Sequence, residues 1–397
     1  MNSFELIPTE ENLIHTLDKD LLKRSKDLVR FYDLILAQEG ASSIAIDGRW
    51  GSGKTFFVKQ SMLLINAKNP MSDMDDEKKA SIVYALPFPK KAEDMPENYD
   101  VAVYYDAWEN DNDTDPVLSL VYEIIKQLGI NYAFDDNSNA FKLAGSVLEA
   151  LTGRNINGII ENLKSDNPLT KIKEEKDLHE NIKNFFTELL VERGNRLVVF
   201  IDELDRCKPS YAVQLLERIK HYLYDDRITF VFSVNLGELQ HTIKHYYGNT
   251  FDACRYLDRF FDMRISLPPA DKTAFYREMG LESSYVLEKI CRKVIDTYNM
   301  ELREATRFYR QVEAAAYEPT HESRKFDFSF RMEKETTFMM YVVPILVRLK
   351  IVDISLYNQF VCGKSSKPLM DIYKDSDKGE WLATRLLNEM KPLKWKR

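Results

Sequence analysis

The stretch that decides the fold is Gly48-Arg49-Trp50-Gly51-Ser52-Gly53-Lys54-Thr55, which fits the phosphate-loop pattern G-x-x-x-x-G-K-[ST]. Glycines let the backbone of such a loop curl until successive N–H groups point at one anion. The following helix offers its positive end, and the lysine adds a full charge. The sequence therefore predicts a nucleotide-binding site made of the following residues: Gly48, Trp50, Gly51, Ser52, Gly53, Lys54, Thr55 and Phe56.

The flanks of this loop have the pattern that its chemistry requires. Residues 42–47 (SSIAID) are typical of a short buried strand, and Phe56 to Ala67 (FFVKQSMLLINA) are typical of a helix. A strand, a glycine-rich loop and a helix in this order place the loop at the start of the helix, where its positive end meets the phosphates. We therefore expect the motif to bind nucleotide.

Composition describes a soluble globular protein. The chain has 397 residues, of which 44% are hydrophobic and 30% are charged, and this length predicts two or three domains. The net charge of −8 gives no overall attraction to nucleic acid or to an anionic membrane. Four scattered cysteines without a C-x-x-C pair fit a reducing cytoplasm, where we expect the protein to be.

Neither a signal peptide nor a membrane span is expected. The first twenty residues are acidic and contain no apolar core segment. The most apolar stretch, Phe338 to Val352, is interrupted by Arg348 and Lys350 and falls short of the roughly 18 clean residues that a span needs. We interpret it as a buried helix.

Strand and helix patterns alternate through the first two thirds of the chain. Because the strands are apolar throughout rather than every second residue, they predict a parallel sheet covered on both faces. The expected strands beyond the first cover residues 101–105, 196–201 and 228–234. The expected helices beside the one after the loop cover residues 21–38, a segment opened by Asp115-Pro116, 177–193 and 209–223.

These patterns predict three regions. Residues 1–40 form a helical lead-in, residues 41–270 an α/β core, and residues 271–397, where only helical patterns occur, an α-helical C-terminal domain. Within the core we expect insertions near residues 69–99 and 131–175, the first with an extra strand over Ser81 to Leu86.

The second half of the candidate site follows the strand of residues 196–201. Asp202 and Glu203 stand at its C-terminal tip, the edge at which open parallel sheets bind ligands. Asp202 and the Thr55 hydroxyl are candidate ligands for Mg²⁺, and Glu203 is placed to act on the attacking water. Asn235 follows the next strand, where it either positions that water or contacts the terminal phosphate, or serves as an ordinary turn residue.

Several motifs together resemble the KAP family of P-loop NTPases. They are GRWGSGKT, YYDAW ending in Trp108, VVFIDELDRC, FVFSVNLGEL and YLDRFFDMRISLPP, and the resemblance covers roughly residues 20–310. It implies the additional-strand, catalytic-glutamate type of sheet, with one strand between those of the phosphate loop and the metal aspartate. The strand Val101 to Tyr105 lies between these two in sequence and agrees with that count. Many members carry transmembrane helices between the two motifs, but residues 110–195 are polar here, so we expect a soluble member.

An arginine that reaches the transferring phosphate from a neighbouring subunit accelerates such reactions. Arg259 is our preferred candidate, ahead of Arg206, Arg255 and Arg303, the last of which resembles a nucleotide-sensing arginine of related ATPases. Acidic neighbours offer Arg206, Arg259 and Arg303 the alternative of a surface ion pair.

The resulting hypothesis is an ATPase that uses Mg²⁺, with Lys54, Glu203, Asn235 and Arg259 as its catalytic residues. It would work as a homo-oligomer or with a partner effector, and the resemblance suggests bacterial defence against phage as its setting. A non-hydrolysing nucleotide switch is the first alternative. A nucleic-acid-stimulated motor is the second, which the acidic composition does not indicate.

Two weaker signals have ordinary alternatives. His241 and His245 have a spacing that can bind zinc, but without a third ligand an exposed helix face is preferred. Trp108 with Tyr104 and Tyr105 either stacks on adenine or packs in the core.

Overall fold

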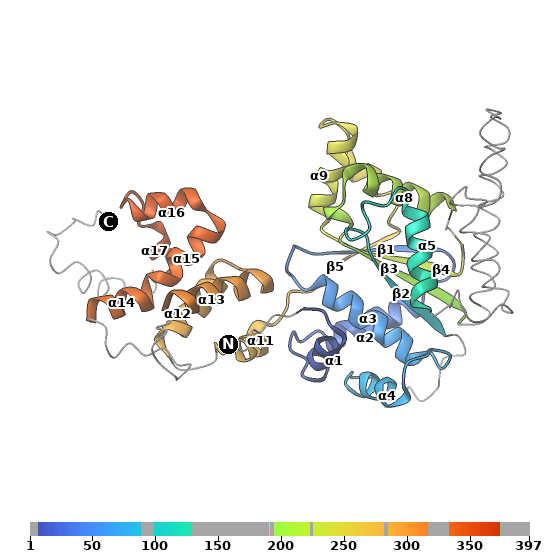
Figure 1. Ribbon diagram of the computed structural model, residues 1–397, viewed down its shortest axis with the longest axis horizontal. Helices are drawn as coiled ribbons and strands as arrows, with labels where there is room; N and C mark the ends of the chain where they lie inside the picture. Colours follow the sequence, from blue (N-terminus) through green and yellow to red (C-terminus); the bar gives the residue numbers. More distant parts are fainter. Residues whose placement is uncertain are drawn as a thin grey trace, which may run out of the picture. The chain divides into compact units, whose positions relative to one another are not determined.

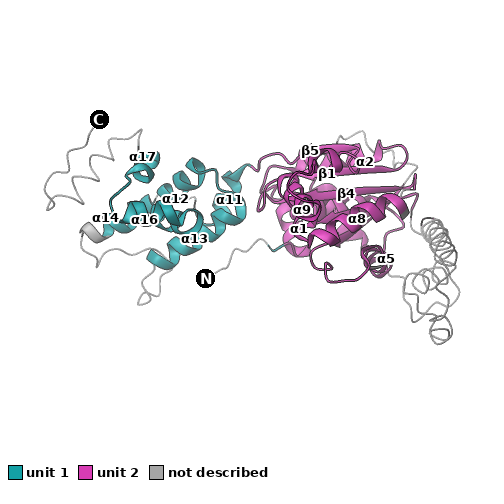
Figure 2. Cartoon of the chain, turned by 90° about the horizontal axis from the view of Figure 1, so that it is seen from above, with its two compact units in different colours: residues 1–7, 271–397 teal, residues 8–270 magenta. Residues whose placement is uncertain are grey.

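The computed structural model describes residues 7–88, 99–128, 190, 194–222, 225–281, 285–316 and 333–373 (Figure 1). The chain divides into two compact units, one of residues 8–270 and one of residues 271–397 with the N-terminal residues 1–7 (Figure 2). The insertion predicted near 131–175 lies outside the described residues, as does the helix predicted over 177–193 apart from Leu190.

A five-stranded parallel sheet forms the centre of the first unit, with the order β2-β3-β4-β1-β5. Its strands are β1 (Ser42–Asp47), β2 (Asp100–Asp106), β3 (Arg196–Asp202), β4 (Ile228–Val234) and β5 (Met263–Ser266). The central strands are apolar along their whole length because both faces are covered: Leu197, Val198, Val199 and Phe200 of β3 are fully buried. The predicted α/β parallel sheet is confirmed.

One strand separates the strand of the phosphate loop from the strand of Asp202, as the additional-strand type requires. That strand is β4, which pairs with β1 on one side and with β3 on the other. Val101 to Tyr105, which we counted between the two in sequence, belong to β2 and lie at the edge of the sheet beyond β3. The number of intervening strands was therefore right, but the strand was not this one.

Helices cover both faces of the sheet (Figure 1). On one face α3 packs against β2, with α1, α2 and α4 around it, and on the other α5, α8 and α9 close the main apolar core. The α-helices of this unit are α1 (Glu10–Asp18), α2 (Ser25–Leu36), α3 (Lys54–Lys68), α4 (Asp76–Tyr84), α5 (Pro116–Gln127), α8 (Pro209–Tyr222), α9 (Leu236–Tyr247) and α10 (Ala253–Leu257). A 3₁₀ turn, η2 (Leu204–Arg206), follows β3.

The predicted extra strand over Ser81 to Leu86 is wrong, because most of this segment belongs to α4. The carboxylate of Asp75 accepts hydrogen bonds from the backbone N–H groups of Glu77 and Lys78 and so caps the start of the helix. Ile82 is the buried residue of α4, which packs against α3, and the Asp75 cap favours a helix over a strand here.

The second unit is helical. It contains α11 (Lys272–Glu278), α12 (Val286–Thr297), α13 (Leu302–Ala316), α14 (Glu333–Tyr341), α15 (Val343–Val352), α16 (Ile354–Val361) and α17 (Lys367–Tyr373). The stretch Phe338 to Val352, which we predicted as one buried helix, is divided between α14 and α15. Pro344 stands in the first turn of α15, where its missing N–H is tolerated, and it favours a new helix start.

Candidate functional site

The phosphate loop connects β1 to α3 and is shaped by its glycines. Gly51 and Gly53 have φ angles of 80° and 91°, in the left-handed region that other residues avoid. A Cβ atom on Gly48 would lie 3.0 Å from the Ser52 hydroxyl, so a side chain there would crowd the loop. The loop therefore has the close, curled backbone that the sequence predicts.

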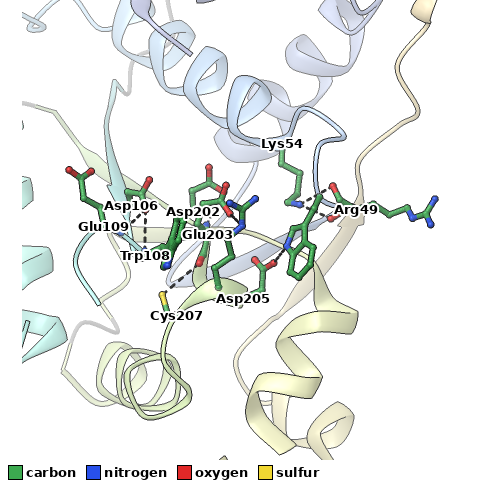
Figure 3. A network of polar contacts seen from close by, with 12 residues as sticks. Arg49, Lys54, Asp106, Trp108, Glu109, Asp202, Glu203, Asp205 and Cys207 are labelled. Atoms are coloured by element: carbon green, nitrogen blue, oxygen red, sulfur yellow. Dashed lines mark hydrogen bonds and ion pairs between the residues drawn. The ribbon is translucent and has the colours of Figure 1, made fainter. Parts of the chain in front are cut away.

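Lys54 opens α3 and is only 8% exposed. Its Nζ donates hydrogen bonds to the carbonyl oxygens of Gly48 at 2.6 Å and Arg49 at 3.2 Å (Figure 3). Burial lowers the pKa of the Lys54 ammonium, while the negative charges of Asp205, Asp202 and Glu203 act in the opposite direction. Lys54 thus lies within electrostatic range of the acidic turn that follows β3.

Asp202 ends β3 and is 1% exposed. Its Oδ2 accepts a hydrogen bond from the Tyr104 hydroxyl at 3.1 Å, and its Oδ1 accepts one from the Glu203 N–H at 3.0 Å. Tyr104 comes from the neighbouring strand β2, so the sheet itself holds the aspartate in place. The orientation of the candidate metal ligand is thus fixed by two hydrogen bonds.

Glu203 adopts a φ angle of 60° and turns the chain sharply into η2. Burial raises the pKa of the Glu203 carboxyl to about 7, and the charge of Asp202 adds to this effect. Its Oε2 lies 2.5 Å from Nε of Arg206, three residues along the same turn. A non-glycine residue in the left-handed region is strained. In this turn the carboxylate of Glu203 and the guanidinium of Arg206 lie next to each other.

Trp50 links the loop to this turn. Its indole Nε1 donates a hydrogen bond to Oδ2 of Asp205 at 2.5 Å. The guanidinium of Arg206 lies over the Trp50 ring at 5.8 Å and over the Trp108 ring at 5.4 Å. Trp108 is 52% exposed and Trp50 is 44% exposed, so neither is a core residue.

The residues present fit a phosphate group with Mg²⁺. The Ser52 hydroxyl is buried and has no hydrogen-bond partner in the described part of the chain, as expected of a donor kept for a ligand. No group of three or more His, Cys, Asp or Glu side chains that could hold a metal occurs among the described residues. Mg²⁺ is usually held by one or two protein oxygens together with substrate phosphates. Thr55, in the first turn of α3, and Asp202 are the residues that would hold it.

Asn235 and Phe56 lie at helix starts beside the site. The Asn235 side chain accepts a hydrogen bond from the Glu238 N–H at 3.4 Å and caps α9, which favours the turn-residue interpretation. Its role in positioning water stays a prediction. Phe56 is 7% exposed in the first turn of α3.

The four arginines differ in position. Arg206 is directed at Glu203 of its own chain. Arg255 on α10 and Arg259 just after it are exposed, so both are accessible to a second molecule. Arg303 is exposed on α13 of the helical unit. The role of Arg259 in trans therefore stays a prediction.

Two further residues hold the site together, and our reading of the sequence did not find them. Arg24 is 5% exposed and donates to the carbonyl oxygens of Ser52 at 3.0 Å and Pro268 at 2.5 Å, so it joins the loop to the segment after β5. The sequence indicates Tyr104 only as an aromatic side chain for stacking or packing, whereas in the structure its hydroxyl orients Asp202. Neither role has a local signal, because each partner is distant in sequence.

The other aromatic and histidine signals have ordinary explanations. Tyr105 is buried and its hydroxyl bonds those of Ser119 and Tyr211, so it packs in the core. His241 and His245 lie on an exposed face of α9.

Comparison with known proteins identifies the family. Residues 28–318 match the KAP family P-loop domain, and the chain belongs to the KAP family. It is also 33% identical over 95 residues to the uncharacterized protein MJ0182 of Methanocaldococcus jannaschii, a match that covers 21% of this chain and 49% of that protein. The chain thus covers about half the length of this relative. Within the described ranges, no helix has both the length and the apolar character needed to cross a bilayer.

Proposed function

We propose that this protein is a Mg²⁺-dependent ATPase. It hydrolyses the bond to the terminal phosphate of ATP at a site between the phosphate loop and the tip of β3. The single observation that carries the proposal is the hydrogen bond from Trp50 to Asp205, because it joins the loop to the turn that bears Glu203. Membership of a P-loop NTPase family supports nucleotide binding, and the geometry supports a site equipped for hydrolysis.

Each residue has a distinct role in this proposal. The loop N–H groups and Lys54 bind and orient the β- and γ-phosphates. Thr55 and Asp202 hold Mg²⁺, which neutralises charge on the phosphates when bound. A carboxylate oxygen of Glu203 accepts the proton of the attacking water, and burial suits it to this task by raising its pKa to about 7. Arg259 of a neighbouring copy is the candidate for a cation supplied in trans.

Phosphate release by the purified chain tests the proposal. We expect Mg²⁺-dependent turnover of ATP that Lys54→Ala abolishes. Glu203→Gln should lower turnover by about 10²-fold or more while nucleotide still binds, because it removes a proton acceptor and retains the shape. Absence of turnover in a wild-type protein that binds ATP would favour the non-hydrolysing switch. Turnover that appears only with added DNA or RNA would favour the motor.

The biological setting rests on the family alone. On that basis we propose that the nucleotide state is coupled to an oligomer or to a partner effector, with bacterial defence against phage as the setting.

A further inference from the structure

Arg206 occupies an unusual position for an arginine near a hydrolytic site. It lies in the turn directly after β3, and its Nε is 2.5 Å from Oε2 of Glu203. The two side chains are only 22% and 16% exposed, so water screens their attraction less than it does at an open surface. The residue proposed to activate water is thus paired with a cation of its own chain.

The guanidinium of Arg206 also contacts two aromatic rings, one of them in the phosphate loop. It lies over the indole ring of Trp50, a loop residue, and over that of Trp108, which follows β2. Such cation–π contacts stabilise the guanidinium near the ring face, and they do not use its N–H hydrogen-bond donors. Arg206 therefore retains donors for a second acceptor, and its supports come from two elements that border the site.

The local charge favours an exchange of partners. Asp202, Glu203 and Asp205 are three acidic side chains that all act on Lys54, while the positive charge of Arg206 acts on it in the opposite direction. A terminal phosphate bound to the loop would bring further negative charge within reach of both cations. An arginine pairs with phosphate in a fork of parallel hydrogen bonds, which is stronger than a single contact to a carboxylate.

We propose that Arg206 is a binding residue for the terminal phosphate in its own subunit, which pairs with Glu203 in the absence of that phosphate and leaves Glu203 when the phosphate binds. The exchange couples two events: the phosphate gains a cation, and the Glu203 carboxylate becomes available to water. This inference rests on the proposed nucleotide site and adds a phosphate contact in cis to it. It also removes Arg206 from the candidates for action in trans.

A double-mutant cycle measured by calorimetry tests the exchange. The probes are Mg·ADP and the Mg²⁺ complex of adenylyl imidodiphosphate, which has a terminal phosphate that is not cleaved. The proteins are the wild type, Arg206→Gln, Glu203→Gln and the double variant. Arg227→Gln is the matched control, because Arg227 also pairs with an acidic residue, Asp225, but lies just before β4. In this parallel sheet the start of β4 is at the opposite edge from the tip of β3, which Arg206 follows.

Two results are expected. Arg206→Gln should weaken the imidodiphosphate by about 10- to 100-fold, the value of a charged hydrogen bond, and ADP by less than about twofold. Glu203→Gln should tighten the imidodiphosphate about fivefold by releasing Arg206, and this gain should vanish in the Arg206→Gln background. The control should change neither affinity.

The outcomes separate this inference from the proposed function. If the wild type binds neither nucleotide, the function itself fails. If both bind but Arg206→Gln weakens them equally, or the gain from Glu203→Gln is the same in both backgrounds, the exchange is overturned and the function stands. Should Arg206→Gln not fold, Arg206→Lys replaces it. A lysine ammonium cannot form the paired hydrogen bonds of a guanidinium to phosphate, so in this background Glu203→Gln should tighten the imidodiphosphate by less than about twofold. An undiminished gain would again overturn the exchange.

Discussion

The indole of Trp50 and the carboxylate of Asp205 are joined by a hydrogen bond of 2.5 Å across 155 positions of sequence. Trp50 belongs to the phosphate loop, and Asp205 belongs to the turn that begins at Glu203. Asp205 is 5% exposed, and burial raises the pKa of its carboxyl while the Trp50 hydrogen bond opposes that rise. This hydrogen bond therefore connects the phosphate loop to the acidic turn after β3.

Removing this donor should destabilise the protein. Trp50→Phe keeps an aromatic ring but leaves a buried acceptor without its partner, which costs about 1–3 kcal/mol. Trp108→Phe is the control, because Trp108 is half-exposed and its ring remains over Arg206; it should change the unfolding free energy by less than about 0.5 kcal/mol. Urea denaturation measures both. Equal losses would mean that the hydrogen bond contributes nothing specific.

Lys54→Ala should abolish stabilisation by nucleotide while the chain stays folded. A ligand present at 100 times its dissociation constant stabilises the native state by about 2.7 kcal/mol. We expect Mg·ATP to raise the melting temperature of the wild type and to leave that of Lys54→Ala unchanged in a thermal-shift assay. A variant that is stabilised as much as the wild type would show that the nucleotide binds elsewhere.

Tyr104→Phe should weaken the response to Mg²⁺. The lost hydroxyl orients Asp202, and removing such a partner of a metal ligand typically lowers metal affinity by about 10- to 100-fold. A Mg²⁺ titration of ATP turnover measures the shift. Tyr84→Phe is the matched control, since Tyr84 is 93% exposed on α4. The role given to Tyr104 fails if both variants respond to Mg²⁺ as the wild type does.

The free energy of unfolding should depend on pH through Asp100, a buried residue of β2 that we do not place in the catalytic site. Burial raises the pKa of this carboxyl from 3.8 to about 6, and Arg196 opposes the rise. Because the folded state then binds the proton more tightly than the unfolded state, Asp100 lowers stability as the pH rises from about 4 to 6. Relative to the wild type, Asp100→Asn should gain up to about 3 kcal/mol between pH 4 and pH 7. Denaturation curves at both pH values measure this difference, and a constant difference would contradict it.

The sequence predicted the fold because its main signals are local. The phosphate-loop pattern, the continuous apolar strands and the Asp115-Pro116 helix start each lie within a few residues, and the structure has β1, β3, β4 and α5 at these places. The apolar residues of Ser81 to Leu86 suggest a strand, but the segment belongs mostly to a helix whose capping carboxylate, Asp75, lies six residues before Ser81.

The connections within the site were not predictable in the same way. The partners Tyr104 and Asp202, Trp50 and Asp205, and Arg24 and Pro268 meet only because the sheet and the loop bring distant segments together. Glu203 and Arg206 are an exception. Their spacing of three residues was visible, but the left-handed turn that directs one to the other was not.

Isothermal titration of Glu203→Gln with Mg·ATP tests most directly the central claim that the loop and the acidic tip of β3 act on one triphosphate. This variant should bind without turning the nucleotide over. We predict one site per chain, no detectable binding after the further change Lys54→Ala, and, after the further change Asp202→Asn, binding that no longer depends on Mg²⁺. A titration without heat at several temperatures, or Mg²⁺-dependent binding that survives Asp202→Asn, would contradict the claim.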